Sequence, residues 1–224
     1  MDAKTSKLIS TVKKLIIFVL GLPLLLLAYH TLARIIRHFY KFPIPEFLTP
    51  LIDNPWRRRI QPPDQMPIRH GLQPRMTVLE VGPGNGRYTV ATARYLGDQG
   101  RLIAIDIEPK VIERVQQAAQ TAGASNVEAR VGNVHQLDFD NNTFDAIYMI
   151  AVIGEIPRPE CAMAEFCRVL RPGGTLAFSE LLMDPDYPLA QTLTRWASSA
   201  GFAVKNKVGN LWAYTLVFEK LQST

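Results

Sequence analysis

The stretch Val78-Leu-Glu-Val-Gly-Pro-Gly-Asn-Gly86 is the most informative part of this 224-residue chain. A short apolar run closes beside an acidic residue, and glycines follow at Gly82, Gly84 and Gly86. Glycine is used where the backbone needs a positive φ or where a Cβ would block a ligand. A strand feeding such a loop, with a helix behind it, presents backbone N–H groups and a helix dipole to a ligand. The stretch therefore predicts a strand, a ligand-binding loop and a helix.

The spacing of the glycines argues against two common nucleotide loops. The third glycine of the dinucleotide pattern Gly-x-Gly-x-x-Gly would fall at Arg87, and no Gly-Lys-Ser/Thr of a triphosphate loop follows. A second apolar run, Leu102 to Asp106, ends in an acid about one βαβ unit downstream. A carboxylate at that point can accept hydrogen bonds from ribose hydroxyls. Asp106 is therefore a candidate ribose-binding residue.

The chain resembles the class I S-adenosylmethionine-dependent methyltransferases. The resemblance is carried by four motifs in order, Glu80-Val-Gly-Pro-Gly-Asn-Gly86, Ile105-Asp-Ile-Glu-Pro109, Phe144-Asp-Ala-Ile-Tyr-Met-Ile150 and Arg168-Val-Leu-Arg-Pro-Gly-Gly174. It extends from about Thr77 to Lys220, and its general character is similar to the small-molecule methyltransferases of ubiquinone and menaquinone biosynthesis. The resemblance implies S-adenosyl-L-methionine as the cofactor and methyl transfer as the reaction.

The resemblance also implies the residues that bind the cofactor: Glu80, Gly82, Gly84, Gly86, Asp106, Ile107, Asn133 and Val134. Two departures from the family pattern matter. The third strand is followed by Gly132-Asn133, where the family often has Gly-Asp, but an asparagine oxygen can still accept a hydrogen bond from an adenine amino group. After the fourth strand, Gly154-Glu155-Ile156 stands where some relatives have paired histidines, so a histidine-based mechanism is not expected.

The candidate catalytic residue is Glu155, which follows the fourth predicted strand. The cofactor's methyl group is already activated, so the protein mainly has to align the acceptor, and a general base is needed only if the acceptor's pKa requires one. The alternative is that Glu155 only caps its turn. Tyr148 lies inside an apolar strand, which favours a core role. Glu180 and Asp184 flank the end of the fifth strand and are candidates for lining the acceptor pocket.

Alternating strands and helices predict an α/β fold, a doubly wound, mainly parallel, seven-stranded Rossmann-like sheet preceded by an N-terminal membrane helix. The expected strands begin at Thr77 and cover 102–106, 127–131, 144–150, 175–181, 202–207 and 212–219. The expected helices cover 87–96, 109–122, 159–170 and 188–200.

The segment from Leu15 to Ala33 contains no charged residue. As a helix, its 19 residues would rise about 28 Å, close to the thickness of a hydrocarbon core. We therefore expect it to associate with a membrane, a cleaved signal peptide and a buried soluble helix being the alternatives. Basic residues flank both ends, so a span and a helix kinked at Pro23 within one leaflet both stay open. The expected location is a membrane, with the catalytic domain facing the cytoplasm.

We expect three segments: residues 1–40, a membrane-associating helix with basic flanks; residues 41–76, a proline-rich connector; and residues 77–224, the methyltransferase domain. Residues 1–75 contain 12 Lys and Arg against 4 Asp and Glu, whereas residues 76–224 contain 13 against 16. The basic part suits contact with membrane lipids, and the mildly acidic domain argues against a nucleic-acid partner.

The connector holds 8 of the 16 prolines and is expected to be stiff and mostly extended. Its apolar residues indicate packing, either onto a membrane surface or across the mouth of the site. Within it, the cluster Arg57-Arg58-Arg59 is interpreted as solvated or membrane-facing, with a phosphate-binding patch as the alternative.

Cysteines and histidines point to no metal. Cys161 and Cys167 have neither metal-ligand nor disulfide spacing and are expected to be reduced thiols, and the four histidines form no ligand pattern.

The favoured function is a membrane-associated methyltransferase acting on a lipophilic small molecule such as a lipid, a quinone or an isoprenoid. The alternatives are an anchored protein or peptide methyltransferase and an inactive, cofactor-binding scaffold.

Overall fold

The computed structural model describes residues 55–222, together with the helical positions Gly21, Leu24, Leu25, Ala28, Thr31, Leu32 and Ile35. The chain divides into two units, Met1–Phe42 and Pro43–Thr224. Most of the predicted membrane helix and the first part of the predicted connector lie outside the described residues.

The predicted membrane location, with the catalytic domain facing the cytoplasm, is wrong for the part of the chain that the structure describes. In that part, no helix is long and apolar enough to cross a bilayer. A spanning helix needs about 20 predominantly apolar residues. The longest helix described without gaps, α6 (Pro109–Thr121), has 13 residues.

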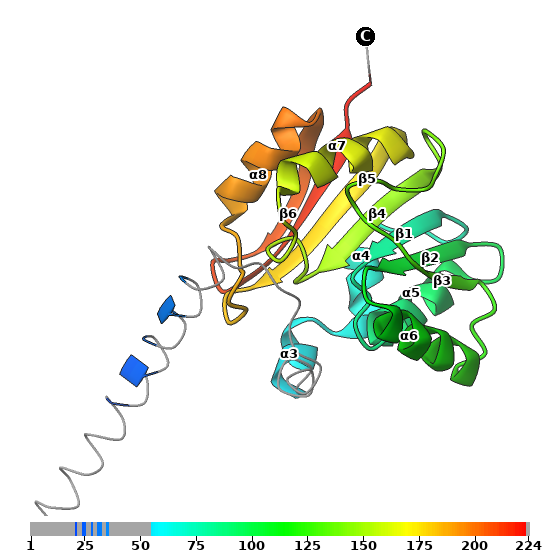
Figure 1. Cartoon of the computed structure of the whole chain (residues 1–224), viewed down its shortest axis with the longest axis horizontal. Helices are drawn as coiled ribbons and strands as arrows, with labels where there is room; N and C mark the ends of the chain where they lie inside the picture. Colours follow the sequence, from blue (N-terminus) through cyan, green and yellow to red (C-terminus); the bar gives the residue numbers. More distant parts are fainter. Residues whose placement is uncertain are drawn as a thin grey trace, which may run out of the picture. The chain divides into compact units, whose positions relative to one another are not determined.

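A seven-stranded sheet forms the centre of the second unit, with the order β3-β2-β1-β4-β5-β7-β6 (Figure 1). The strands are β1 (Thr77–Val81), β2 (Arg101–Asp106), β3 (Val127–Val131), β4 (Phe144–Ile150), β5 (Leu170–Leu181), β6 (Phe202–Gly209) and β7 (Ala213–Lys220). The first five strands are parallel, and β7 is antiparallel to both β5 and β6. The predicted α/β fold with a mainly parallel, seven-stranded sheet is confirmed.

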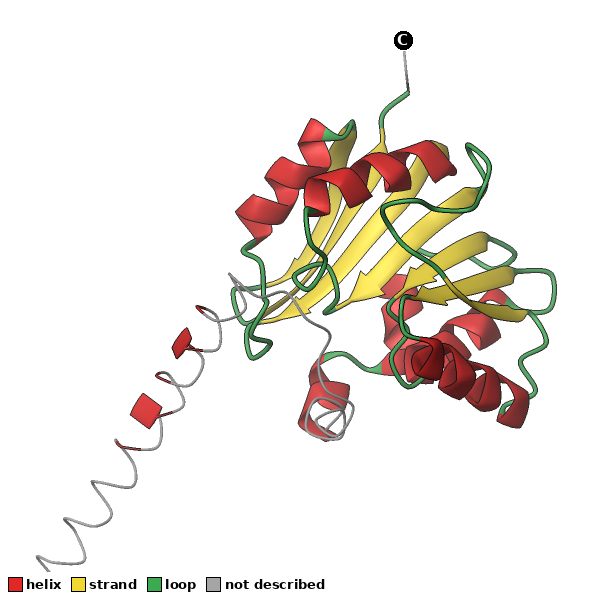
Figure 2. Ribbon diagram, in the orientation of Figure 1, coloured by secondary structure: helices red, strands yellow, loops and turns green. Residues whose placement is uncertain are grey.

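The central strands read as continuous apolar runs because helices cover both faces of the sheet. Four of the five residues of β1 and four of the six of β2 are buried. On one face lie α4 (Met66–Arg69), α5 (Arg87–Leu96) and α6, and on the other lie α7 (Pro159–Val169) and α8 (Ala190–Ser199), as Figure 2 shows. Each face has its own apolar core, one centred on Phe166 and Phe178 and the other on Val78 and Leu96.

The described part of the connector is helical, so its predicted extended conformation is wrong there. Two short helices, α3 (Pro55–Ile60) and η2 (Pro63–Gln65), precede α4. Proline stands in the first turn of η2 and α4, where its missing N–H and fixed φ favour a helix start. Met66 and Leu72 are buried, so this segment packs as part of the folded domain.

Candidate functional site

The carboxyl ends of β1, β2, β4 and β5 meet at one edge of the sheet. The strand order reverses between β1 and β4, because β1 pairs with β2 on one side and with β4 on the other. In open α/β sheets, ligands bind outside the strand ends at such a switch point. The predicted cofactor residues lie in the last residues of β1 and β2 or directly after β1, β2 and β3, and Glu155 follows β4, so the fold brings both groups to this edge.

The glycine loop combines close packing with open space. Gly82, Gly84 and Gly86 have φ values of 68°, 59° and 79°. A Cβ on Gly82 would lie 2.4 Å from Cγ2 of Val152, and one on Gly86 would lie 3.0 Å from Cβ of Ala118. A Cβ on Gly84 would meet nothing within 4 Å. The first and third glycines therefore permit packing, and the second borders open space at the switch point.

Helix α5 begins directly behind the loop. Gly86 is the N-cap residue of this helix and has no side chain that could cap it. Oδ1 of Asn85 accepts the N–H of Arg87 at 3.2 Å. The amino-terminal N–H groups of a helix and its dipole attract anionic groups. The loop therefore faces the switch point with a partial positive charge.

Glu80 lies in β1 behind the loop, and its side chain is almost fully buried. Burial raises the pKa of Glu80 to about 7, and the hydroxyl groups of Thr89 and Tyr148 offset part of this effect. Its Oε2 has no hydrogen-bond partner among the described residues. Tyr148 is buried, donates to Oγ1 of Thr92 at 3.0 Å and stacks on His70, so it has the core position expected from the sequence.

Asp106 is the last residue of β2, next to the glycine loop's strand. Its Oδ1 accepts the backbone N–H of Glu108 at 2.9 Å, which fixes the carboxylate at the strand end. Burial raises the pKa of Asp106. The next residue, Ile107, has 63% of its surface exposed. An acid and an exposed apolar side chain thus stand together at the mouth of the site.

Asn133 and Val134 follow β3, where the sequence places them, but Asn133 already has partners. Its Oδ1 accepts the backbone N–H of His135 at 2.9 Å and lies 3.2 Å from Nδ1 of the same residue. The oxygen expected to meet an adenine amino group is therefore engaged in its own turn. Nε2 of His135 lies 2.6 Å from the carbonyl oxygen of Pro157, which ties this turn to the segment after Glu155. Val134 packs against the core.

Four acidic side chains gather at the ends of β4 and β5. Glu155 is half-buried in the turn after β4, and Glu180 is buried at the end of β5. The pKa of Glu180 is raised well above its ordinary value by burial and by the nearby Asp184, Glu155 and Asp186. Arg57 partly offsets this effect. We call these four acids and Arg57 the acid cluster.

Arg57 is the residue of the site whose role the sequence did not reveal. Its side chain is only 7% exposed and forms an ion pair with Asp184, so the interpretation of a solvated or membrane-facing cluster is wrong for this residue. Arg57, in α3, and Gln61, which directly follows that helix, are both buried, and the Gln61 N–H donates to the carbonyl oxygen of Arg57 at 2.8 Å. The two nearby acids, Asp184 and Asp186, indicate that a basic residue could pair with them. The sequence does not show which of the three adjacent arginines, Arg57, Arg58 or Arg59, does so.

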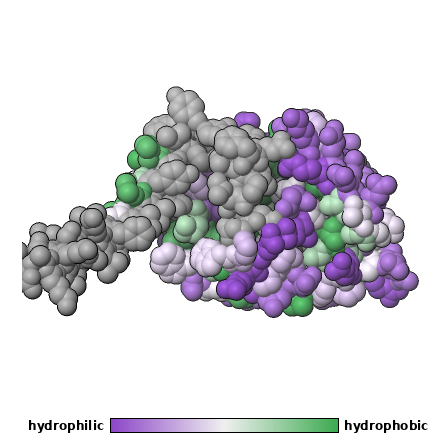
Figure 3. All heavy atoms as spheres, turned by 90° about the horizontal axis from the view of Figure 1, so that it is seen from below, coloured by the Kyte–Doolittle hydropathy of each residue, from purple (hydrophilic) through white to green (hydrophobic). Residues whose placement is uncertain are grey.

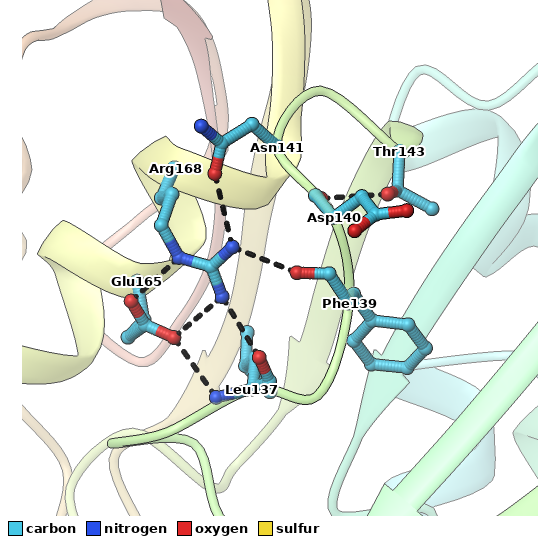
Figure 4. A network of polar contacts seen from close by, with 7 residues as sticks. All are labelled: Leu137, Phe139, Asp140, Asn141, Thr143, Glu165 and Arg168. Carbon is cyan, nitrogen blue, oxygen red and sulfur yellow. Dashed lines mark hydrogen bonds and ion pairs between the residues drawn. The ribbon is translucent and has the colours of Figure 1, made fainter.

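Arg168, from the fourth family-like motif, has a structural position (Figure 4). Its guanidinium donates to the carbonyl oxygens of Leu137 and Phe139, to Oδ1 of Asn141 and to the Glu165 carboxylate. The Glu165 carboxylate also accepts the N–H of Leu137 at 2.8 Å. This network fastens the β3–β4 connection to α7 and contributes no group to the carboxyl edge.

Exposed apolar side chains lie beside the acid cluster. Leu182 N–H donates to the carbonyl oxygen of Trp212 at 2.8 Å, and the Tyr187 hydroxyl donates to that of Leu211 at 2.7 Å. These bonds tie the β6–β7 turn to the β5–α8 loop. The large exposed residues of the two segments form what we call the apolar rim: Met183, Leu189, Leu211 and Trp212. The face in Figure 3 is largely hydrophilic, with hydrophobic side chains in smaller groups.

The remaining titratable candidates are residue types that can bind metal ions. No group of three or more His, Cys, Asp or Glu residues within the described residues could hold a metal ion. Cys161 and Cys167 are free thiols.

Comparisons with known proteins identify the family of the folded domain. A family model described as a methyltransferase domain matches residues 72–215. The probable methyltransferase ltbC of Aspergillus luteorubrus is 35% identical over 127 residues, which cover 53% of this chain and 44% of that protein. The ubiquinone/menaquinone biosynthesis C-methyltransferase UbiE of Enterobacter sp. (strain 638) is 29% identical over 144 residues, covering 64% of this chain and 56% of that protein. The chain spans about half the length of these curated relatives.

Solved structures share the fold. A SAM-dependent methyltransferase from Aquifex aeolicus superposes with a TM-score of 0.74 at 22% identity, covering 80% of this chain and all of that one. The [4+2]-cyclase SpnF superposes with a TM-score of 0.65 at 18% identity, covering 75% of this chain and 83% of that one. Because one of these neighbours is named as a cyclase, the shared fold does not define the reaction, which has to be argued from the site.

Proposed function

The chain belongs to the methyltransferase domain family, and on this premise we propose that it transfers a methyl group from S-adenosyl-L-methionine to a lipophilic small molecule such as a lipid, a quinone or an isoprenoid. The observation that carries this proposal is the joining of two half-sites at one sheet edge. The glycine loop and Asp106 form one half, and the acid cluster with the apolar rim forms the other.

The residues of the first half fit the cofactor that the family implies. Open space borders Gly84, a carboxylate stands at Asp106, and the buried Oε2 of Glu80 lacks a hydrogen-bond partner within the described part of the chain. We assign Asp106 to the ribose hydroxyls and the following residues to the rest of the cofactor: Glu80, Gly82, Gly84, Gly86, Ile107, Asn133 and Val134. When bound, the cofactor supplies a methyl group on a sulfonium centre, which is activated for displacement without help from the protein.

The position of Glu155 supports a role on the acceptor. Its turn adjoins the glycine loop, because Val152 packs against Gly82, and it lies within electrostatic reach of Glu180. We propose that Glu155 takes a proton from an acceptor hydroxyl or amine and that the surrounding turn orients the acceptor. General bases of this kind contribute about 10²–10⁴-fold to a rate.

Two observations support a lipophilic acceptor. The exposed apolar rim lies beside the acid cluster, where an apolar molecule can contact Leu211 and Trp212. The name of the UbiE relative describes C-methylation in the biosynthesis of quinones, which are lipophilic. A quinol-like compound is therefore the first acceptor to test.

The proposal is tested with methyl-labelled S-adenosylmethionine, the purified chain and the naphthoquinol menadiol. Products are separated into an organic extract and a protein precipitate. We expect label in the extract and none with heat-denatured protein. Label confined to protein or to an added peptide mixture would favour the protein methyltransferase alternative. Binding of S-adenosylhomocysteine without label in either fraction, across lipid, quinol and isoprenoid acceptors, would favour the scaffold.

A further inference from the structure

Glu180 is a buried carboxyl group that the proposed transfer does not use. It lies at the end of β5, in register with Tyr214 of β7, and only 1% of its surface is exposed. Its Oε1 has no hydrogen-bond partner among the residues that the structure describes. A buried polar atom without a partner destabilises a folded protein, so its presence requires an explanation.

The donors near Glu180 have other partners. The Tyr214 hydroxyl donates to the carbonyl oxygen of Pro188 at 2.7 Å, and the Arg57 guanidinium pairs with Asp184. The other acids of the cluster are hydrogen-bond acceptors when ionised. Around Glu180, the described residues therefore supply many acceptor oxygens, and the donors identified here are already engaged.

We propose that Glu180 binds the polar end of the methyl acceptor, which presents a hydrogen-bond donor, a hydroxyl or an ammonium group, to its Oε1. This inference rests on the proposed function and specifies the acceptor's chemistry. The acceptor is amphipathic, with its donor group at Glu180 and its apolar body along the apolar rim. A compound of the same shape without a donor, such as an oxidised quinone, has no group that can donate to Oε1 of Glu180.

Binding of acceptor-like probes to the protein saturated with S-adenosylhomocysteine tests this without any turnover. The probes are menadiol, which carries hydroxyl donors; decylamine, which carries an ammonium group; and menadione, which has no donor. The variants are Glu180→Met, which removes both oxygens at similar length, and Glu180→Gln, which keeps one. Glu160→Gln, an exposed acid on α7, is the control. Unchanged S-adenosylhomocysteine affinity shows that each variant is folded.

At least one donor-bearing probe should bind the wild type, and Glu180→Met should weaken it tenfold or more, with Glu160→Gln unchanged. In Glu180→Gln, a hydroxyl-bearing acceptor should keep its affinity within about threefold, because an amide oxygen still accepts. An ammonium-bearing acceptor should weaken about tenfold or more, because a bound cation favours the ionised form of the Glu180 carboxyl, which glutamine cannot adopt. Menadione should bind all variants alike. The inference is overturned if neither donor-bearing probe binds the wild type, if Glu180→Met binds like the wild type, or if menadione weakens equally.

Thermal unfolding of the ligand-free protein gives a second measurement. If Glu180 serves a ligand, Glu180→Met should unfold at the same or a higher temperature, because it removes an unpartnered buried oxygen. A structural role predicts a lower unfolding temperature, and a marked decrease would count against the inference. If Glu180-dependent binding is found but no lipid, quinol or isoprenoid acceptor is labelled, the proposed function fails and the binding site stands.

Discussion

The three glycines of the glycine loop are needed for different reasons, although they look equivalent in the sequence motif. Gly82 and Gly86 give room to Val152 and Ala118, and this requirement comes from packing. Gly84 borders open space and has a φ of 59°, so its requirement comes from the backbone and from whatever occupies that space. Only Gly84 is therefore expected to separate ligand binding from folding.

Replacing Gly84 with valine should abolish S-adenosylhomocysteine binding in calorimetry, because a branched side chain fills the ligand's approach. The left-handed backbone conformation should also lower the free energy of unfolding by about 1–2 kcal/mol. Gly123→Val is a matched control, since Gly123 has a φ of 66° and open space but lies far from the site, after α6. It should show the same loss of stability with normal binding. If both variants bind S-adenosylhomocysteine normally, the glycine loop is not part of the cofactor site.

The role of Asp106 depends on its charge and on its position. Asp106→Asn keeps an oxygen for the Glu108 N–H, whereas Asp106→Ala removes it. We expect both variants to bind S-adenosylhomocysteine more weakly, by about 1–3 kcal/mol, because charge-assisted bonds to the ribose are lost. The alanine variant should bind least. Calorimetric affinities equal to that of the wild type would mean that another acid holds the ribose.

Glu155→Gln distinguishes a general base from a structural residue. If Glu155 takes a proton, kcat should fall about 10²–10⁴-fold while cofactor affinity stays the same, since the two side chains are nearly isosteric. If Glu155 only stabilises its turn, the free energy of unfolding should fall by about 1 kcal/mol with near-normal kcat. Turnover and thermal stability measured on one preparation distinguish these outcomes.

Whole elements were predictable where local pattern determines them. The expected bounds of α5, β3 and β4 agree with the structure, because apolar spacing and flanking glycine or proline residues act locally. β5 begins at Leu170 instead of Thr175, because Leu170 pairs with Phe144 across a register shift that no local pattern records. α8 begins at Ala190 instead of the expected Pro188. The carbonyl oxygen of Pro188 accepts a hydrogen bond from the Tyr214 hydroxyl, a contact on another strand that no local pattern records.

The candidate site was predictable to the same extent. Positions that follow β1, β2 and β4 could be found from motifs, because each motif is continuous in sequence. Glu180 could also be named as a candidate, because it closes an apolar strand. Arg57 could not be identified, because its ion-pair partner, Asp184, lies more than 100 residues away and only the fold brings the two together. Asn133 was placed at the right strand, but its bonds to His135 depend on the exact turn.

The Arg57–Asp184 ion pair should control the docking of α3. Arg57→Met leaves Asp184, whose side chain is 18% exposed, without its cation. Breaking a largely buried pair in this way should lower the free energy of unfolding by about 3 kcal/mol. Arg59→Met, on the exposed side of the same helix, should change it by less than about 0.5 kcal/mol. Urea unfolding of both variants checks this, and equal losses would contradict a specific role for Arg57.

At the scale of the whole molecule, Glu80 and His70 give folding stability opposite dependences on pH. Glu80 has a raised pKa of about 7, so its contribution is full below pH 4.5 and is lost as the pH rises to 7. His70 is buried neutral with a pKa lowered to about 3, so its contribution is present above pH 6.5 and is lost as the pH falls. Each slope is about 1.4 kcal/mol per pH unit, so the two oppose each other between pH 4.5 and 6.5.

A variant that lacks Glu80 isolates the contribution of Glu80 to the pH dependence of stability. Glu80→Gln removes the falling slope, so the free energy of unfolding of the wild type relative to this variant should decrease by about 3 kcal/mol from pH 4.5 to 7. Urea unfolding at pH 4.5, 5.5 and 7 measures this difference, in which all other titrating groups cancel. Parallel pH profiles for the two proteins would show that Glu80 is not protonated in the fold.

The position of β7 between β5 and β6 has a consequence for biosynthesis. β6 pairs only with β7 among the described strands, and β5 has β7 as its neighbour on that side. Ala213–Lys220 emerges from the ribosome after β6, so a nascent chain exposed only as far as Gly209 holds a strand without a sheet partner and a sheet with a bare edge. Such edges invite pairing with other chains. Before β7 emerges, the growing chain is therefore exposed to aggregation and is expected to benefit from a chaperone.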